Sequence, residues 1–223
     1  MALDLLVPSW SDAGGRHGFR PPGVGTGPGQ PLRAHQVHGA TVIEVGPGAQ
    51  SPVGEADALV SGTVGLGVGI ATADCVPILL DAAGAGVAAA VHAGWRGSLE
   101  GVALAALRHL TSRHGVSAAD LRVALGPSID GCCFEIEHEI AARFAARWGS
   151  RVWEFWRERP TGKGTLDLRG INALLLIDAG VDENAIERVG PCTFCGPGPW
   201  ASYRREGPGC GRQLAWIAPG ARP

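Results

Sequence analysis

The sequence predicts a mixed α/β fold (α/β or α+β) in one domain that spans residues 1–223. Segments with apolar residues at helical spacing alternate with short apolar strands along the chain. A chain of 223 residues with 45% hydrophobic residues is long enough for one large domain with a substantial core. The 35 glycines and 16 prolines separate these segments without any period, so they indicate many tight turns in a folded protein.

A loop and then a series of strands are predicted for the first half of the chain. Residues 11–31 are mostly glycine, proline and polar residues, which is typical of a long loop. Short apolar runs then predict strands at 41–45, 56–60, 69–80 and 87–91. The runs at 69–80 and 87–91 are almost continuously apolar, so we expect both strands to be buried on both faces.

Three helices are predicted in the second half. The first has its apolar residues at helical spacing between Leu99 and Leu110, with Ser98 as the N-cap and Gly115 just beyond its end. The second spans 135–148 and the third spans 167–179. Further strands are expected at 121–125, 186–189 and 213–217.

Charge and hydropathy exclude two classes of partner. The net charge of −2 lacks the basic excess of nucleic-acid-binding proteins. The longest apolar stretch, residues 64–91, is interrupted by aspartate, proline and glycine, so it predicts two buried strands and no membrane span. Because the first ten residues do not resemble a signal peptide, we expect a cytoplasmic protein. Its six cysteines are then expected to be free thiols, metal ligands or nucleophiles.

Reactive side chains gather at the predicted strand ends. His35 and His38 precede a strand, Asp74 and Cys75 lie within one, and His92 ends the next. One thiolate and two imidazoles can hold zinc and leave a position open for water. The same Cys and His can instead form a nucleophile–base pair. The ligands are 37 and 17 positions apart, which matches no compact metal motif, so the residues alone leave both alternatives open.

Other cysteine and glycine motifs are weak. Cys192-Thr-Phe-Cys195 is a CxxC pair, but with no second such pair it predicts neither a structural zinc site nor a thioredoxin-like redox motif. Cys132 and Cys133 are interpreted as packing residues. The glycines of residues 65–69 lack the strand–turn–helix context of a dinucleotide loop.

Several longer motifs occur in order along the chain: HQVHGATV, ADALVSG, GIATADCVPILL, VAAAVHAGWRG and ALGPSIDGCCFEI. Together with Ser202-Tyr-Arg-Arg205 and the later Gly211-Arg212, they resemble the whole length of a YfiH-like laccase-domain protein, a family also labelled multicopper polyphenol oxidase or purine nucleoside phosphorylase. The resemblance implies a layered α/β sandwich with mixed sheets, of a cysteine-hydrolase type that is related to deamidating bacterial toxins.

The resemblance also implies a metal site and an activity. Its metal ligands are His38, Cys75 and His92, with zinc as the expected metal and copper as an alternative. The implied reactions are phosphorolysis of adenosine, inosine, guanosine or methylthioadenosine and deamination of adenosine. The substrates would therefore be a purine nucleoside and phosphate. Cys75, His92 and Asp74 are the catalytic candidates, with Asp74 as an acid–base group or a ligand-orienting group.

Four arginines are candidates for phosphate binding because guanidinium groups pair well with phosphate: Arg96, Arg204, Arg205 and Arg212. Compared with the family, residues 11–34 form a shortened N-terminal loop, which puts substrate contacts from that loop in doubt.

Two other enzyme classes and one binding class stay open. Copper oxidation of phenols is disfavoured, because only seven histidines are present and a four-copper arrangement needs more. A metal-free Cys–His hydrolase, such as an amidase that edits cell-wall precursors, is the second alternative. A zinc-stabilised binding protein is the third.

Overall fold

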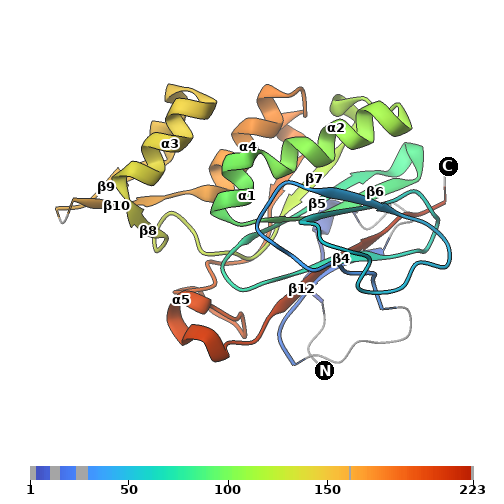
Figure 1. Ribbon diagram of the computed structural model, residues 1–223, viewed down its shortest axis with the longest axis horizontal. Coiled ribbons are helices and arrows are strands. Elements are labelled where there is room, and N and C mark those ends of the chain that lie inside the picture. Colours follow the sequence, from blue (N-terminus) through green and yellow to red (C-terminus); the bar gives the residue numbers. More distant parts are fainter. Residues whose placement is uncertain (1–3, 11–15, 24–29, 161, 222–223) are drawn as a thin grey trace.

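The computed structural model describes residues 4–10, 16–23, 30–160 and 162–221. They form a layered α/β sandwich, as the family resemblance implies, with one mixed sheet and two antiparallel sheets (Figure 1). No helix among these residues is long and apolar enough to cross a membrane.

A six-stranded sheet forms the middle layer. Its strand order is β11-β7-β5-β6-β3-β2. The two outer pairs, β11·β7 and β3·β2, are parallel, and the central pairs are antiparallel. The strands are β2 (Val42–Val45), β3 (Ala58–Ser61), β5 (Val76–Ala82), β6 (Val87–Ala93), β7 (Arg122–Leu125) and β11 (Ile186–Arg188). Every residue of β5 and β6 is buried, which confirms the expectation from their continuous apolar runs.

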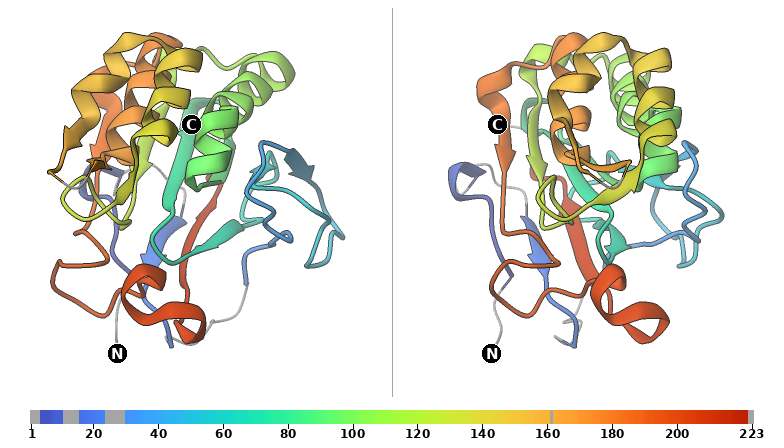
Figure 2. Two further views of the ribbon diagram at one scale, coloured as in Figure 1. Left: turned by 60° about the vertical axis from the view of Figure 1, so that its left-hand side comes forward. Right: turned by 90° about the vertical axis from the view of Figure 1, so that its left-hand side faces the viewer.

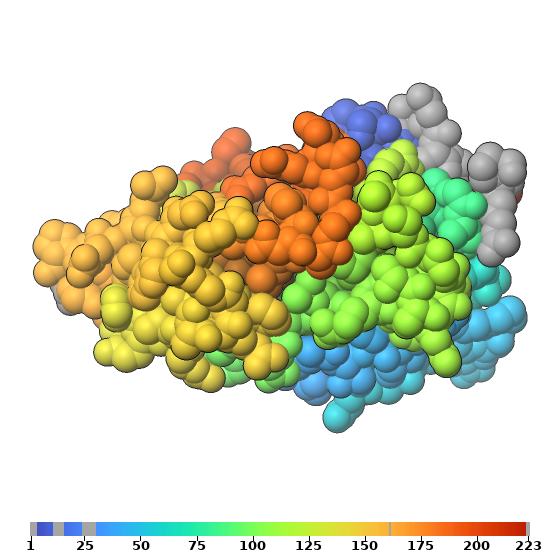
Figure 3. All heavy atoms as spheres, turned by 90° about the horizontal axis from the view of Figure 1, so that it is seen from above, coloured from blue at the N-terminus to red at the C-terminus, as the bar shows by residue number. Residues whose placement is uncertain are grey.

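Helices cover one face of this sheet. They are α1 (Trp95–Glu100), α2 (Val102–His114) and α4 (Leu168–Asp178), and Figure 3 shows the outer surface that α2 and α4 form with α3 (His138–Trp148). Ile78 and Leu80 of β5 point into the core beneath the helices. Gly115 ends α2 in a left-handed conformation with φ of 65°, as predicted, because glycine adopts this conformation without strain.

A second sheet covers the opposite face. It has the order β1-β12-β4 and is antiparallel throughout. Its strands are β1 (Arg16–Arg20), β4 (Val68–Thr72) and β12 (Gln213–Ala218). Leu79 alternates with its neighbours on β5 and points into this second core. The molecule therefore has three layers, with helices, the large sheet and the small sheet in that order (Figure 1).

A peripheral unit extends from one end of these layers. It contains α3 and a small antiparallel sheet of order β8-β10-β9, made of β8 (Glu135–Glu137), β9 (Trp156–Glu158) and β10 (Lys163–Leu166). The short α5 (Tyr203–Glu206) lies away from the helix layer, near the small β1-β12-β4 sheet (Figure 2).

The structure corrects several predicted elements. The predicted strand 69–80 is two strands, β4 and β5, which belong to different sheets and are separated by the turn that holds Asp74 and Cys75. The predicted loop 11–31 contains strand β1, because β12 supplies a pairing partner almost 200 residues away. The rest of that prediction falls partly on residues 11–15 and 24–29, outside the described residues.

Two helix starts also differ from the prediction. Ser98 is not an N-cap, because it lies inside α1, which begins after Gly94. The helix predicted from residue 135 begins at His138, because β10 pairs with residues 135–137 and holds them in extended conformation.

Candidate functional site

The fold brings His38, Cys75 and His92 together. His38 lies in the loop before β2, Cys75 in the turn between β4 and β5, and His92 on β6. The Cys75 sulfur and one ring nitrogen of each histidine lie within 4.8 Å of one another. The rings of His38 and His92 meet edge to face, with centroids 4.8 Å apart. This grouping supplies a donor set that suits zinc and also copper.

The backbone at two positions of this site is strained. Among the described residues, His38 (φ 62°) and Asp74 (φ 83°) are the non-glycine residues with positive φ. Such conformations cost free energy and persist where the surrounding contacts impose them, often at functional sites. Here they turn the chain sharply beside His38 and Cys75.

Asp57, which sequence analysis missed, orients His92. Its fully buried carboxylate lies 2.7 Å from His92 Nδ1. It also accepts hydrogen bonds from the backbone N–H groups of Val37, His38 and Gly39. Asp57 thereby fixes the ring of one candidate ligand and the loop that carries another, and it leaves His92 Nε2 free to face Cys75. The only sequence signal was a charged residue at the start of an apolar strand.

The site favours a thiolate next to a protonated imidazole when no metal is bound. Burial raises the pKa of the Cys75 thiol, but hydrogen bonds and charge from His38 and His92 outweigh burial and bring the pKa to about 6. Burial lowers the pKa of His92, but hydrogen bonds to Asp57 and Cys75 raise it to about 9. Burial raises the pKa of Asp57, but hydrogen bonds from the His92 ring and from the Gly39 and His38 backbone N–H groups outweigh it and hold that pKa below its usual value.

Glycines let the backbone approach the site closely. A Cβ atom at Gly94 would lie 3.0 Å from both Cys75 Sγ and His38 Cδ2. A Cβ atom at Gly97 would lie 2.8 Å from the Gly39 carbonyl oxygen, so this glycine lets α1 pack against the loop that carries His38. Both glycines of the HAGWRG motif are therefore needed for steric reasons, because a side chain at either position would crowd the site.

A pocket of about 510 Å³ opens onto the three side chains. This volume lies within the range of small-molecule sites. Aromatic side chains and arginines form part of its wall, and the lining residues that bear on function are His38, Asp74, Cys75, His92, Phe134, Tyr203, Arg204 and Arg212. The pocket is thus a chemically mixed cavity with the candidate ligands at one side.

Asp74 lines this pocket and ties its walls together. Its carboxylate accepts hydrogen bonds from Thr193 Oγ1 and from the Arg204 backbone N–H, each at 2.7 Å. Its backbone carbonyl accepts one from the Ile129 N–H. Asp74 was predicted as an acid–base or ligand-orienting group, and the carboxylate that contacts His92 directly is that of Asp57.

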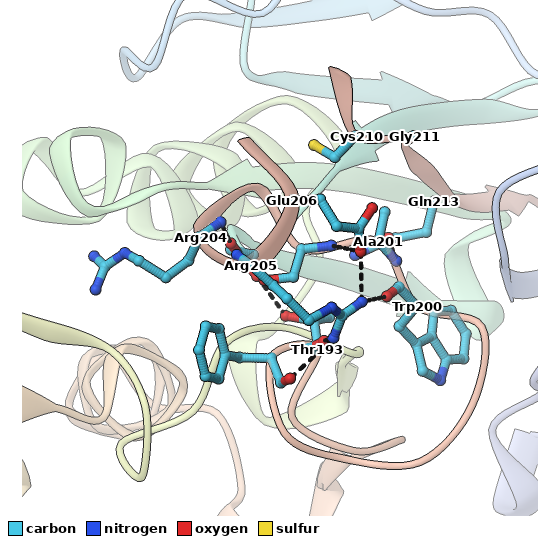
Figure 4. Close-up of polar contacts among 12 residues, drawn as sticks. Thr193, Trp200, Ala201, Arg204, Arg205, Glu206, Cys210, Gly211 and Gln213 are labelled. Atoms are coloured by element: carbon cyan, nitrogen blue, oxygen red, sulfur yellow. Dashed lines mark hydrogen bonds and ion pairs between the residues drawn. The ribbon is translucent and has the colours of Figure 1, made fainter. Parts of the chain in front are cut away.

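The four candidate arginines are not brought together. Arg204 and Arg212 line the pocket, whereas Arg96 lies over the Trp95 ring outside it. Arg205 points into a loop, where its guanidinium donates hydrogen bonds to the carbonyls of Thr193, Phe194 and Trp200. Figure 4 shows this network and shows the Arg204 side chain pointing away from it. The guanidinium of Arg205 is therefore occupied by the protein itself.

Of the adjacent cysteines, Cys133 packs against the main core, as predicted, whereas Cys132 is exposed. Cys132 and Cys133, interpreted as packing residues, lie beside the CxxC pair Cys192 and Cys195, and the four sulfur atoms are within 4.8 Å of one another. Sequence spacing missed this group because its second pair is two adjacent cysteines, 59 positions before the first of the CxxC pair.

Comparisons with known proteins agree with this fold. Residues 23–219 match the family model described as multi-copper polyphenol oxidoreductase laccase. The chain is 34% identical over 190 residues to purine nucleoside phosphorylase YlmD of Geobacillus stearothermophilus, covering 82% of this chain and 69% of YlmD. It is 37% identical over 161 residues to adenosine deaminase RL5 of an unknown prokaryotic organism, covering 72% of this chain and 61% of RL5.

Solved structures extend the likeness over the whole chain. The crystal structure of YlmD from Geobacillus stearothermophilus superposes with a TM-score of 0.86 at 28% identity, covering 99% of this chain and 98% of YlmD. That of the hypothetical protein YfiH from Bacillus licheniformis gives a TM-score of 0.79 at 25% identity, covering 84% of this chain and 73% of YfiH. The chain therefore belongs to the YfiH-like family of multi-copper polyphenol oxidoreductase laccases.

Proposed function

We propose that this protein is a zinc-dependent purine nucleoside enzyme, which cleaves adenosine and related nucleosides with phosphate and deaminates adenosine with water. The observation that carries the proposal is the convergence of His38, Cys75 and His92, held by Asp57, at one side of a pocket of about 510 Å³. The names of the relatives, which include purine nucleoside phosphorylases and an adenosine deaminase, support this substrate class.

His38, Cys75 and His92 would hold the zinc, through one sulfur and two ring nitrogens. The donor set fits zinc, because it joins a thiolate to imidazoles and the second ring nitrogen of His92 is already held by a carboxylate. When bound by three protein ligands, zinc supplies Lewis acidity that makes a nucleophile available at neutral pH.

The rest of the pocket matches the two other parts of the substrate. Phe134 and Tyr203 offer aromatic surface for a purine ring. Arg204 and Arg212 line the pocket, and although Nη1 of each already donates to a backbone carbonyl, that of Glu135 and that of Cys210, their other N–H groups can bind phosphate. Asp74 lines the pocket and is the proposed acid–base group, which exchanges a proton with the purine base.

The test is incubation of the zinc-loaded protein with adenosine, with and without phosphate, followed by chromatography. We expect adenine and ribose 1-phosphate when phosphate is present and inosine when it is not. His38→Ala should abolish both reactions, because it removes a metal ligand. His109→Ala is the matched control, because His109 pairs with Glu44 on the surface away from the pocket. If the wild type forms neither product, the proposal fails.

A specific observation also favours a metal-free Cys–His hydrolase. Cys75, His92 and Asp57 form a chain of side chains in the order of a nucleophile, a base and an orienting carboxylate. In this reading the protein hydrolyses amides, and a glutamine-containing peptide is a suitable probe. Ammonia release that survives chelation of metal but not alkylation of Cys75 would support the hydrolase over the nucleoside enzyme.

A further inference from the structure

Four cysteines from two distant loops meet outside the pocket. Cys132 and Cys133 follow β7, and Cys192 and Cys195 follow β11. All four sulfurs lie within 4.8 Å of one another, and those of Cys132 and Cys195 are 3.6 Å apart. Zinc–sulfur bonds of about 2.3 Å in a tetrahedron place the sulfurs about 3.8 Å apart. The observed spacing is therefore close to that of a tetrathiolate metal site.

The backbone around Cys192 is shaped to support a thiolate. The Asp130 N–H lies 3.4 Å from Cys192 Sγ, and the N–H groups of Phe194 and Cys195 also point at this sulfur. Hydrogen bonds of this kind stabilise the negative charge of a sulfur ligand. They come from both loops, so the arrangement depends on their being held side by side.

A tight turn brings Cys195 back beside Cys192. The Gly196 N–H donates a hydrogen bond of 2.8 Å to the Cys192 carbonyl oxygen. A Cβ atom at Gly196 would lie 2.6 Å from that oxygen, so only glycine fits without a shift. A further hydrogen bond joins this loop to the loop that carries Cys132 and Cys133, because the Thr193 N–H donates to the Ser128 carbonyl oxygen at 2.9 Å.

We propose that Cys132, Cys133, Cys192 and Cys195 form a second zinc site, with four thiolate ligands and a structural role. Four sulfur ligands in a tetrahedron are the donor set of structural zinc, with no position open for water. Binding converts the thiols to thiolates and releases their protons to solvent, with no change in oxidation state. The Arg159 guanidinium donates a hydrogen bond to the Cys132 carbonyl and adds positive charge near the anionic centre.

The second zinc would hold the pocket together. The loop of residues 126–134 contributes Ile129 and Phe134 to the pocket, and the segment 190–205 contributes Tyr203 and Arg204. Both carry two of the four cysteines. A metal that joins them fixes these two parts of the pocket wall, which already meet where Arg204 lies over the Phe134 ring, without touching the substrate.

Metal counting on the whole chain, purified without added metal, tests this site separately from the first. We expect about one zinc per site, so Cys75→Ser should keep the zinc of the four-cysteine site and Cys132→Ser/Cys195→Ser should lose it. Cys210→Ser is the matched control, because Cys210 belongs to neither cluster. If the His38 site takes no zinc, Cys75→Ser will not change the count, but the cysteine double variant will still lower it.

Cobalt identifies the ligands. Cys75→Ser reconstituted with cobalt should show the intense sulfur-to-metal absorption of a tetrathiolate site, and the further changes Cys132→Ser/Cys195→Ser should remove it. Zinc content that is unchanged in Cys132→Ser/Cys195→Ser overturns the proposal. So does iron in place of zinc, or a Cys132–Cys195 disulfide found by mass spectrometry in protein kept under reducing conditions.

Alkylation of the wild type gives an answer even if the double variant does not fold. Cys132 and Cys195 are exposed. Bound zinc should therefore protect both from iodoacetamide, and a chelator should raise the labelling of both, that of Cys195 more than that of the slowly reacting Cys132. Equal labelling before and after chelation overturns the site.

Discussion

At the scale of single residues, the candidate site depends on a buried carboxylate. Asp57 is fully buried, and removing an unpaired charge from water is very costly. The cost is offset because both of its oxygens accept hydrogen bonds, from the His92 ring and from consecutive backbone N–H groups around His38. The hydrogen bonds that stabilise the Asp57 carboxylate therefore also hold His38 and His92, two of the three proposed ligands, in position.

Asp57→Asn should weaken zinc binding at the His38 site about 10- to 100-fold, because the amide holds His92 less firmly and raises its basicity less. Chelator competition in the Cys132→Ser/Cys195→Ser background measures this affinity alone. Asp81→Asn is the control, because Asp81 is also a buried carboxylate but pairs with Arg122 away from the pocket. Equal zinc affinity in Asp57→Asn and the wild type would show that Asp57 has no such role.

The pKa of the Cys75 thiol should be far below that of Cys132 in metal-free protein. Its pKa is about 6, whereas burial and the nearby sulfurs raise the pKa of Cys132 to about 11. Only the thiolate reacts, so alkylation of Cys75 should be fast above pH 6 and fall about tenfold for each unit below it. Cys132 should react slowly at neutral pH although it is exposed. Peptide mapping after brief iodoacetamide treatment from pH 5 to 8 decides this, and faster labelling of Cys132 than of Cys75 at pH 7 would contradict it.

At the scale of elements, the site lies where strands change sheets and a helix begins. The chain leaves the small sheet at the end of β4, turns at Asp74 and Cys75, and enters the large sheet as β5. The next strand, β6, delivers His92 and passes through Gly94 into α1. The register of β5 and β6, with Pro77 opposite His92, sets Cys75 beside the end of β6.

Gly94→Ala tests whether zinc binding requires the backbone before α1 to lie close to Cys75 and His38. Gly94 has φ −70° and ψ 167°, which alanine adopts without strain, so the effect should come from the added Cβ atom 3.0 Å from Cys75 Sγ and His38 Cδ2. We expect weaker zinc binding at the His38 site with the fold retained, measured by chelator competition and thermal unfolding. Gly84→Ala is the control, because a Cβ there meets nothing within 4 Å. Unchanged zinc affinity in Gly94→Ala would mean that the ligands have room to move.

Periodicity within a segment made part of the fold predictable. The apolar face of α2 and the buried run of β6 are local patterns, and they were located correctly from sequence. The buried character of β5 was also predicted, but its start was not, because the run was joined to β4. Strand β1 was missed because its stability comes from pairing with β12, which no local pattern shows. The break between β4 and β5 was missed because a strained aspartate, and no glycine or proline, makes the turn.

The candidate site was predictable only in part, for the same reason. His38, Cys75 and His92 came from a resemblance over the whole chain, since their spacing alone matches no metal motif. Asp57 and the grouping of Cys132 with Cys192 depend on contacts between segments far apart in sequence. Arg204 and Arg205 are adjacent in sequence, and only the structure separates the one that lines the pocket from the one that holds a loop.

At the scale of the whole molecule, the pocket is assembled from the ends of both sheets and two long loops. The large sheet supplies His92, the end of β4 supplies Thr72, and the C-terminal region supplies Arg204 and Arg212. Three groups of contacts join these parts, through Asp74, through Arg205 and through the four cysteines. Substrate binding and loop integrity are therefore separable by mutation.

The arginines make this separation measurable as a product ratio. Only phosphorolysis needs bound phosphate, so Arg212→Ala and Arg204→Ala should lower the ratio of adenine to inosine. A charge-assisted hydrogen bond contributes about 1.5–3 kcal/mol, or roughly 10- to 150-fold in this ratio.

Arg205→Ala should instead lower the free energy of unfolding by about 1–3 kcal/mol, because it leaves backbone carbonyls without donors. It should reduce both products alike. Chromatography across phosphate concentrations gives the ratio, and chemical denaturation gives the stability. A ratio that falls in Arg205→Ala but not in Arg212→Ala or Arg204→Ala would move the phosphate site from the pocket wall to the loop.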